Sequence, residues 1–173
     1  LIARLLGDKG VREYAAAAQA VKAIRPNSVF SLVGGLDSNP NSITQTELDA
    51  WVTAGTVQYL GRLSDVRPAL AACSVFVLPS YREGTPRTVL EAMASGTGVI
   101  VSDKGGPKDY VTHGENGLVF KAHDYDSFKT EMNKLFSDRE FMKKLGQNAR
   151  GSIGEHTDEK LFESFTGHIG ELI

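Results

Sequence analysis

The amino-acid sequence predicts an α/β fold, namely a doubly wound parallel sheet of about six strands followed by a helical C-terminal tail. Short, continuously apolar runs alternate with helix-length amphipathic segments, and this alternation is typical of a parallel sheet covered by helices on both faces. The 173 residues are enough for a single domain with a sizeable core. From Asp124 onward the pattern becomes wholly helical.

The individual elements follow from the apolar pattern. Six runs rich in β-branched residues are the expected strands: Leu1–Ala3, Val29–Val33, Val57–Leu60, Val75–Leu78, Val99–Val101 and Leu118–Phe120. Between them the sequence predicts helices over 11–25, 44–54, 65–72, 86–95 and 107–112, and the tail adds 124–136, 138–152 and 158–172. This order is Rossmann-like, so we expect ligands to bind beyond the carboxyl ends of the strands.

Composition excludes several classes of protein. The net charge of −2 provides no basic field for nucleic acid, so we expect no nucleic-acid partner. No apolar stretch approaches the ~20 residues of a membrane-spanning helix. The single Cys73 rules out an internal disulfide, and with four scattered histidines it forms no metal-ligand spacing.

Residues 81–96 read YREGTPRTVLEAMASG and place two acids beside a strand end. Thr85 is a candidate helix cap and Pro86 suits the first helical position. Glu83 precedes the cap, while Glu91 lies on the flank of the helix, so both acids can face one crevice. The amides at Gly84 and Thr85 open the helix, whose N-terminus favours an anion. The stretch therefore suggests a site with amide donors for a phosphate and carboxylates for hydroxyl groups.

Simpler interpretations of the same charges remain open from the residues alone. Arg87 and Glu91 are spaced i,i+4 and can form a surface ion pair, and Glu83 can be a solvated loop acid. Arg4 and Lys9 follow the first strand and can neutralise a diphosphate. They can equally be ordinary surface cations.

Five blocks of sequence, in order, resemble one known family, the retaining GT-B glycosyltransferases of family four. They are ARLLGDKGV, VFSLVGGLDSNPNSI, VQYLGRLSDVRP, VFVLPSYREGTPRTVLEAMASG and ENGLVF. The similarity is to the C-terminal domain, in the subgroup that builds bacterial capsule, O-antigen and other surface or lipid-linked glycans. The fourth block holds the paired glutamates of the family, which are separated by seven residues.

The resemblance implies roles for the charged residues. Glu91 would hold the ribose hydroxyls of the nucleotide, and Glu83 would face the donor sugar ring as the glycosidic bond breaks. Arg4 and Lys9 match the family's basic pair on the diphosphate. They would offset the charge of the leaving group without a metal ion or other cofactor.

The same resemblance implies donor-binding roles for five further residues. Gly84, Thr85 and Pro86 would shape the loop whose amides meet the sugar and the phosphates, and the base would lie near Arg62 and Leu63. Two departures concern local geometry: Gly98 stands where the family usually has proline, and GGPKD (105–109) replaces a Pro-Gly-Cys-Arg-Glu-like stretch.

The resemblance also implies the domain organisation, activity and location of the whole protein. We expect residues 1–173 to be the donor-binding domain of a longer chain, with an N-terminal acceptor domain lying outside it. The activity would be transfer of a hexose or N-acetylhexosamine, with UDP the favoured nucleotide, to a saccharide or lipid-linked acceptor. The expected location is the cytoplasm, with the inner face of the cell membrane as the place where the full-length protein would act.

Two other functions stay open at this point. A nucleotide-sugar epimerase of similar two-domain shape would release free sugar from UDP-sugar without an acceptor. A non-catalytic nucleotide-binding or interaction domain would be indifferent to Glu91→Ala, whereas a transferase would lose activity sharply.

Overall fold

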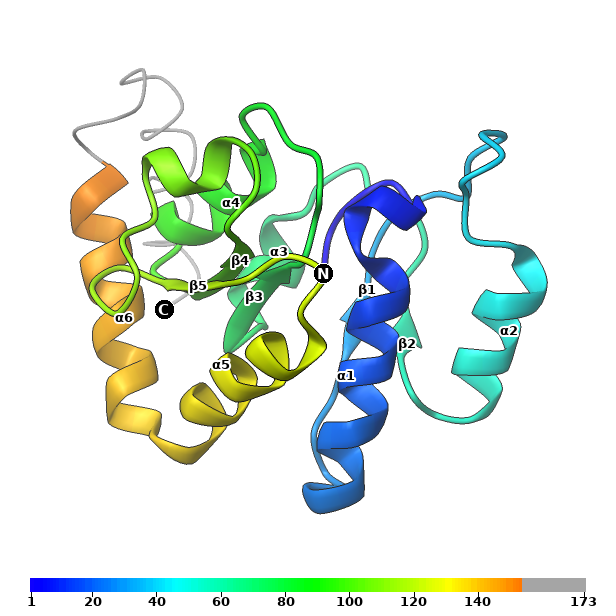
Figure 1. Cartoon of the computed structure of the whole chain (residues 1–173), viewed down its shortest axis with the longest axis horizontal. Coiled ribbons are helices and arrows are strands. Elements are labelled where there is room, and N and C mark those ends of the chain that lie inside the picture. Colours follow the sequence, from blue (N-terminus) through cyan, green and yellow to red (C-terminus); the bar gives the residue numbers. More distant parts are fainter. Residues whose placement is uncertain (154–173) are drawn as a thin grey trace.

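The structure, a computed structural model, describes residues 1–153 and is a Rossmann-like α/β fold (Figure 1). The strands are β1 (Ser31–Leu32), β2 (Gln58–Tyr59), β3 (Val75–Leu78), β4 (Gly98–Ser102) and β5 (Leu118–Phe120). The α-helices are α1 (Val11–Ile24), α2 (Gln45–Thr53), α3 (Arg67–Ala71), α4 (Arg87–Ala94), α5 (Tyr125–Ser137) and α6 (Arg139–Ile153). Two short 3-10 helices are η1 (Gly7–Lys9) and η2 (Gly106–Asp109).

All strand pairs in the described chain are parallel, as predicted. One sheet has the order β1-β2 and the other β3-β4-β5. The expected first strand, residues 1–3, forms only a bridge between Ile2 and Val33. The amide of Ala3 still donates to Val33 O at 3.0 Å, so this segment lies beside β1. The expected six strands are therefore five strands and one bridged segment.

Helices cover both faces of the larger sheet, which is the doubly wound arrangement. Along β3, Val77 enters a core formed with α1 and α5, whereas Phe76 enters a second core formed with α4. The same alternation separates Ile100 from Val99 in β4. Because successive side chains of a strand point to opposite faces, a wholly apolar strand requires cover on both sides.

Three local predictions need correction. Thr85 does not cap α4, because the helix begins at Arg87 with Pro86 as N-cap residue and without a side-chain cap. The predicted helix 107–112 is the short η2, and α3 is shorter than 65–72. The predicted helix 158–172 lies outside the described residues.

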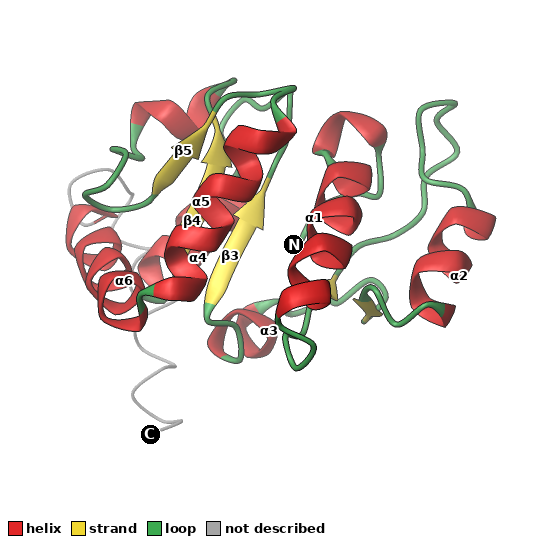
Figure 2. Ribbon diagram, turned by 60° about the horizontal axis from the view of Figure 1, so that its bottom comes forward, coloured by secondary structure: helices red, strands yellow, loops and turns green. Residues whose placement is uncertain are grey.

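The carboxyl ends of the strands meet at one edge. Figure 2 shows the arrowheads of β3, β4 and β5 pointing the same way, and the loops that follow them gather there. None of the helices within residues 1–153 has both the length and the apolar character needed to cross a bilayer.

Candidate functional site

Lys9 and Glu83 form an ion pair at this edge. The Lys9 Nζ lies 2.8 Å from Glu83 Oε1 and also donates to the carbonyl oxygen of Arg82 at 3.3 Å. The two side chains are only 16% and 11% exposed. Buried charges are stable only when paired, so this contact fixes the loop after β3 against η1.

One close approach that requires glycine and two hydrogen bonds hold these loops together. Gly10 has φ 70°, and a Cβ atom there would collide with the carbonyl of Pro79. The Asp8 carbonyl oxygen accepts from Tyr81 N at 2.8 Å and from Ser80 Oγ at 3.0 Å. The start of α1 can therefore lie directly on the chain that leaves β3.

The loop after β4 packs on the other side of the Glu83 loop. The Gly106 amide donates to Glu83 O at 3.2 Å, and Cβ atoms at Gly105 and Gly106 would collide with the Glu83 and Gly84 carbonyls. Ser102 Oγ donates a hydrogen bond to the carbonyl oxygen of Ser80. Glu83 is thus held between two loops, which limits where its carboxylate can lie.

Glu91 lies in α4 and is half-buried. Burial raises the pKa of its carboxyl group, and the nearby Arg87 opposes that rise. Arg87 and Glu91 are not among the ion pairs formed by the described residues. The surface ion pair considered from sequence is therefore not formed, although the Arg87 charge still acts on the Glu91 carboxyl group.

Arg4 is placed differently from Lys9. Its guanidinium is 69% exposed and its Nη1 lies 3.2 Å from Asp37 Oδ2. Asp37 is fixed in turn, because its other carboxylate oxygen accepts from Asn39 N at 2.9 Å. Within residues 1–153, no hydrogen bond or ion pair joins Arg4 or Glu91 to the Lys9–Glu83 pair.

Arg62 and Leu63 follow β2, at the same strand-end edge. Arg62 is exposed, and its Cδ is 3.9 Å from the position of a Cβ atom at Gly35. Leu63 is partly buried against the second core. Gly34 N donates to Gly61 O at 2.9 Å, so the loops after β1 and β2 lie together.

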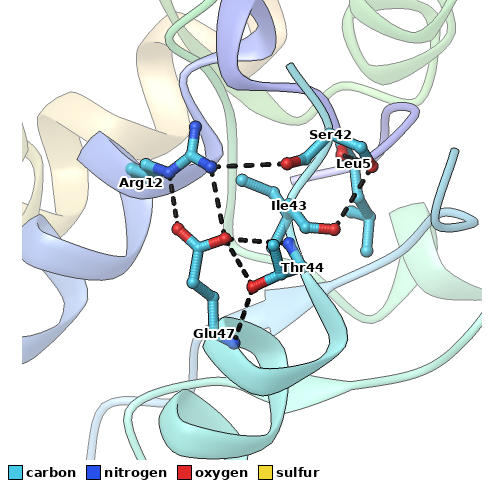
Figure 3. Close-up of polar contacts among 6 residues, drawn as sticks. All are labelled: Leu5, Arg12, Ser42, Ile43, Thr44 and Glu47. Carbon is cyan, nitrogen blue, oxygen red and sulfur yellow. Dashed lines mark hydrogen bonds and ion pairs between the residues drawn. The ribbon is translucent and has the colours of Figure 1, made fainter. Parts of the chain in front are cut away.

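A polar network beside Lys9 was not anticipated from the sequence (Figure 3). Arg12, in the first turn of α1, contacts both carboxylate oxygens of Glu47 at 2.7 and 3.2 Å. Glu47 and Thr44 form a reciprocal capping box at the start of α2. Ile43 N and Ser42 Oγ both donate to Leu5 O, at 2.8 and 3.0 Å. The Thr-x-x-Glu spacing is the signal that could have revealed the capping box.

Groups of three or more potential metal-ligating side chains are absent from the described part of the chain. Lys9 is the cation that contacts Glu83, whereas Arg4 and Arg12 pair with Asp37 and Glu47. The arrangement offers a partly buried cation, two carboxylates and a glycine-rich loop at the ends of parallel strands. Such a set can bind an anion that carries hydroxyl groups.

Comparison with known proteins identifies the family. Residues 1–152 match the family model for glycosyl transferases group 1. The chain is 37% identical over 149 residues to the N,N'-diacetylbacillosaminyl-diphospho-undecaprenol alpha-1,3-N-acetylgalactosaminyltransferase of Campylobacter jejuni, covering 86% of this chain and 38% of the relative. It is 30% identical over 157 residues to the UDP-Gal:alpha-D-GlcNAc-diphosphoundecaprenol alpha-1,3-galactosyltransferase of Escherichia coli, covering 88% and 40%.

Solved structures agree on the fold. Sucrose-phosphate synthase from Thermosynechococcus elongatus matches with a TM-score of 0.78 at 26% identity, over 98% of this chain and 43% of that one. HepE of Anabaena in complex with UDP matches with a TM-score of 0.79 at 24% identity, over 99% and 46%. The chain thus spans about two fifths of the two curated relatives. It belongs to the glycosyl transferases group 1 family.

Proposed function

We propose that this chain is the donor-binding half of a retaining glycosyltransferase. The full protein would move a hexose or N-acetylhexosamine from a nucleoside diphosphate sugar to a surface or lipid-linked glycan. The Lys9–Glu83 contact of 2.8 Å carries the proposal. It places a cation suited to a diphosphate next to a carboxylate suited to sugar hydroxyls, at the strand ends where nucleotides bind in such folds.

UDP is the proposed nucleotide. The name of the Escherichia coli relative specifies UDP-Gal as donor, and the HepE structure contains UDP. The names of both curated relatives specify lipid-linked undecaprenol acceptors. These properties belong to those proteins and support, by family membership, a UDP-sugar donor and a lipid-linked acceptor here.

The unliganded ion pair suggests how the donor would be held. A diphosphate would compete with Glu83 for Lys9, because a phosphate also offers charged oxygen acceptors. Lys9 would then stabilise the negative charge that develops on the departing nucleoside diphosphate as the sugar–oxygen bond breaks. Glu83, released from Lys9, would accept hydrogen bonds from the sugar hydroxyls and face the positive charge that develops on the ring.

The remaining residues have supporting roles in the proposal. Arg4 would give a second charge to the diphosphate, so that no metal ion is needed. Glu91 would accept hydrogen bonds from the ribose hydroxyls. Arg62 and Leu63 would line the base, and the loop of Gly84, Thr85 and Pro86 would turn its amides toward the sugar and phosphates.

The acceptor side belongs to the rest of the protein. We propose that an N-terminal domain binds the saccharide or lipid-linked acceptor, in the cytoplasm at the inner face of the cell membrane. This chain alone would then bind nucleoside diphosphates weakly and transfer no sugar.

Calorimetry on this chain tests the proposal. UDP and UDP-N-acetylglucosamine should give heats of binding, and Lys9→Met should weaken both by roughly tenfold or more, the loss expected for one charged hydrogen bond. Absence of any heat with UDP or GDP would contradict the proposal. Release of free sugar from UDP-sugar without an acceptor, by the full-length protein, would favour the epimerase alternative.

A further inference from the structure

His123 has an unusual backbone conformation. Among residues 1–153 it is the one non-glycine residue with positive φ, at 62°. L-residues with a Cβ are strained in this region, and glycine is not. Strain that persists in a native structure points to a use for the side chain.

The turn itself does not need the His123 side chain. On one side, Ala122 N donates to Asp103 Oδ1 at 2.9 Å. On the other, Asp124 caps α5 by accepting from Ser127 N at 2.9 Å. Glycine could therefore make this turn with less strain, so the imidazole ring must account for the histidine.

The ring stacks on Tyr81. The two ring centroids are 4.0 Å apart and the planes meet at 16°. Tyr81 also borders a pocket of about 220 Å³ lined in part by Glu13, Phe120 and His123. The Tyr81 hydroxyl interacts with the Glu13 carboxylate, which lines the same pocket, and the stack adds a direct contact with the face of the ring.

Tyr81 is directly connected to the Lys9–Glu83 pair. Its amide donates to Asp8 O, one residue before Lys9, at 2.8 Å. Its neighbour Arg82 gives the carbonyl that Lys9 Nζ contacts at 3.3 Å. Glu83 follows one residue later. The Tyr81 ring is therefore attached to the same short backbone segment that carries both partners of Lys9.

We propose that His123 is a positioning residue, which clamps Tyr81 and so holds the backbone of the Glu83 loop where the Glu83 carboxylate can meet the donor sugar. This inference rests on the proposed function. It adds that the loop after β5, which contributes no donor-binding residue of its own, sets the geometry of the loop after β3. Burial, and secondarily the Glu13 carboxylate, raises the pKa of the Tyr81 hydroxyl, in agreement with a partly buried ring next to Glu13.

Substitution of His123 separates a positioning role from a structural one. His123→Gly removes the ring and the strain, so the melting temperature should stay the same or rise. Its affinity for UDP-N-acetylglucosamine should fall three- to tenfold, toward that of Glu83→Gln, while affinity for UDP falls less. His123→Phe is the matched control, because it keeps a ring for stacking, and it should bind within about twofold of the wild type.

A ligand-free measurement keeps the inference separate from the proposed function. In His123→Gly, the Tyr81 and Gly106 amides, bonded to Asp8 O and Glu83 O, should exchange with solvent at least threefold faster. In His123→Phe they should not. If the wild type binds no nucleotide but this difference is found, the proposed function fails and the clamp stands.

Two results would overturn the clamp. One is His123→Gly with unchanged UDP-N-acetylglucosamine affinity and unchanged exchange at Tyr81 and Gly106. The other, relevant if His123→Gly also lowers the melting temperature, is additivity with Glu83→Gln in a double-mutant cycle. Non-additive losses in that cycle would support the clamp.

Discussion

The amide of Gly106 donates a hydrogen bond to the carbonyl oxygen of Glu83 at 3.2 Å, so the loop after β4 lies directly on the loop after β3. A methyl group at Gly106 would overlap the Gly84 carbonyl, which is backbone and cannot rotate away. The position of the proposed sugar-facing acid therefore depends on a glycine in a neighbouring loop.

The first prediction concerns this close approach. Gly106→Ala should lower the free energy of unfolding by roughly 1–3 kcal/mol, because the loops must separate to admit the methyl group. Gly151→Ala in α6 is the control, since no atom lies within 4 Å of its added Cβ; it should be neutral or stabilising by up to about 1 kcal/mol. Urea unfolding of both variants measures the difference, and equal stabilities would contradict the contact.

The second prediction compares two cations. Lys9→Met leaves the poorly exposed Glu83 carboxylate unpaired, so it should lower the free energy of unfolding by about 1–3 kcal/mol and weaken UDP binding. Arg4→Met breaks an exposed ion pair and should change stability by less than about 1 kcal/mol, while still weakening UDP binding. Urea unfolding and calorimetry of the two variants test this. Loss of stability in Arg4→Met, or unchanged UDP affinity in both, would be inconsistent with these roles.

The third prediction concerns Glu47, whose pKa is lowered from 4.5 to about 2, first by Arg12 and then by the Thr44 amide. A carboxyl group whose pKa is lowered in the native state stabilises the fold when the pH is above its pKa in the unfolded chain. This stabilisation is lost as the pH falls through the pKa of the native state. Because the pair is partly solvated, Glu47→Gln should cost about 1 kcal/mol or less at pH 7. Measured by urea unfolding, the free energies of unfolding of the wild type and Glu47→Gln should converge between pH 4.5 and pH 2. A difference that stays constant over this pH range would disprove the electrostatic origin of the stabilisation.

The fourth prediction concerns Glu91, whose pKa is raised by burial. Because its pKa is raised, ionised Glu91 destabilises the fold at pH values above 4.5, the pKa of the carboxyl group in the unfolded chain. This penalty disappears as the pH falls below 4.5. Glu91→Gln should therefore be at least as stable as the wild type at pH 7, with no difference at low pH.

The same Glu91→Gln variant should bind UDP roughly tenfold more weakly, because an amide is a poorer acceptor than a carboxylate for ribose hydroxyls. In the full-length protein, transfer activity should fall sharply. A variant that is both less stable at pH 7 and unchanged in UDP affinity would assign Glu91 to the fold rather than to the donor.

Local patterns in the sequence were sufficient for most elements. The strands Val75–Leu78 and Leu118–Phe120 have the predicted bounds, and α1, α2 and α4 lie within one or two residues of prediction. These segments are recognisable because an apolar run or a 3.6-residue period is a property of neighbouring residues. The helix expected over 107–112 is only the short η2, because the chain leaves the helical conformation at Tyr110 and the Asn116 side chain binds Tyr110 O and Thr112 N.

The sequence by itself determined the α/β class, the family and the candidate residues, because strand and helix patterns and short motifs are contained in consecutive positions. Only the tertiary structure decided which candidates meet. In the structure Lys9 pairs with Glu83, 74 positions away along the chain, whereas Arg4 pairs with Asp37. The ring of His123 stacks on that of Tyr81. Such contacts depend on how loops pack after the strands align, and that packing leaves no periodic signal along the chain.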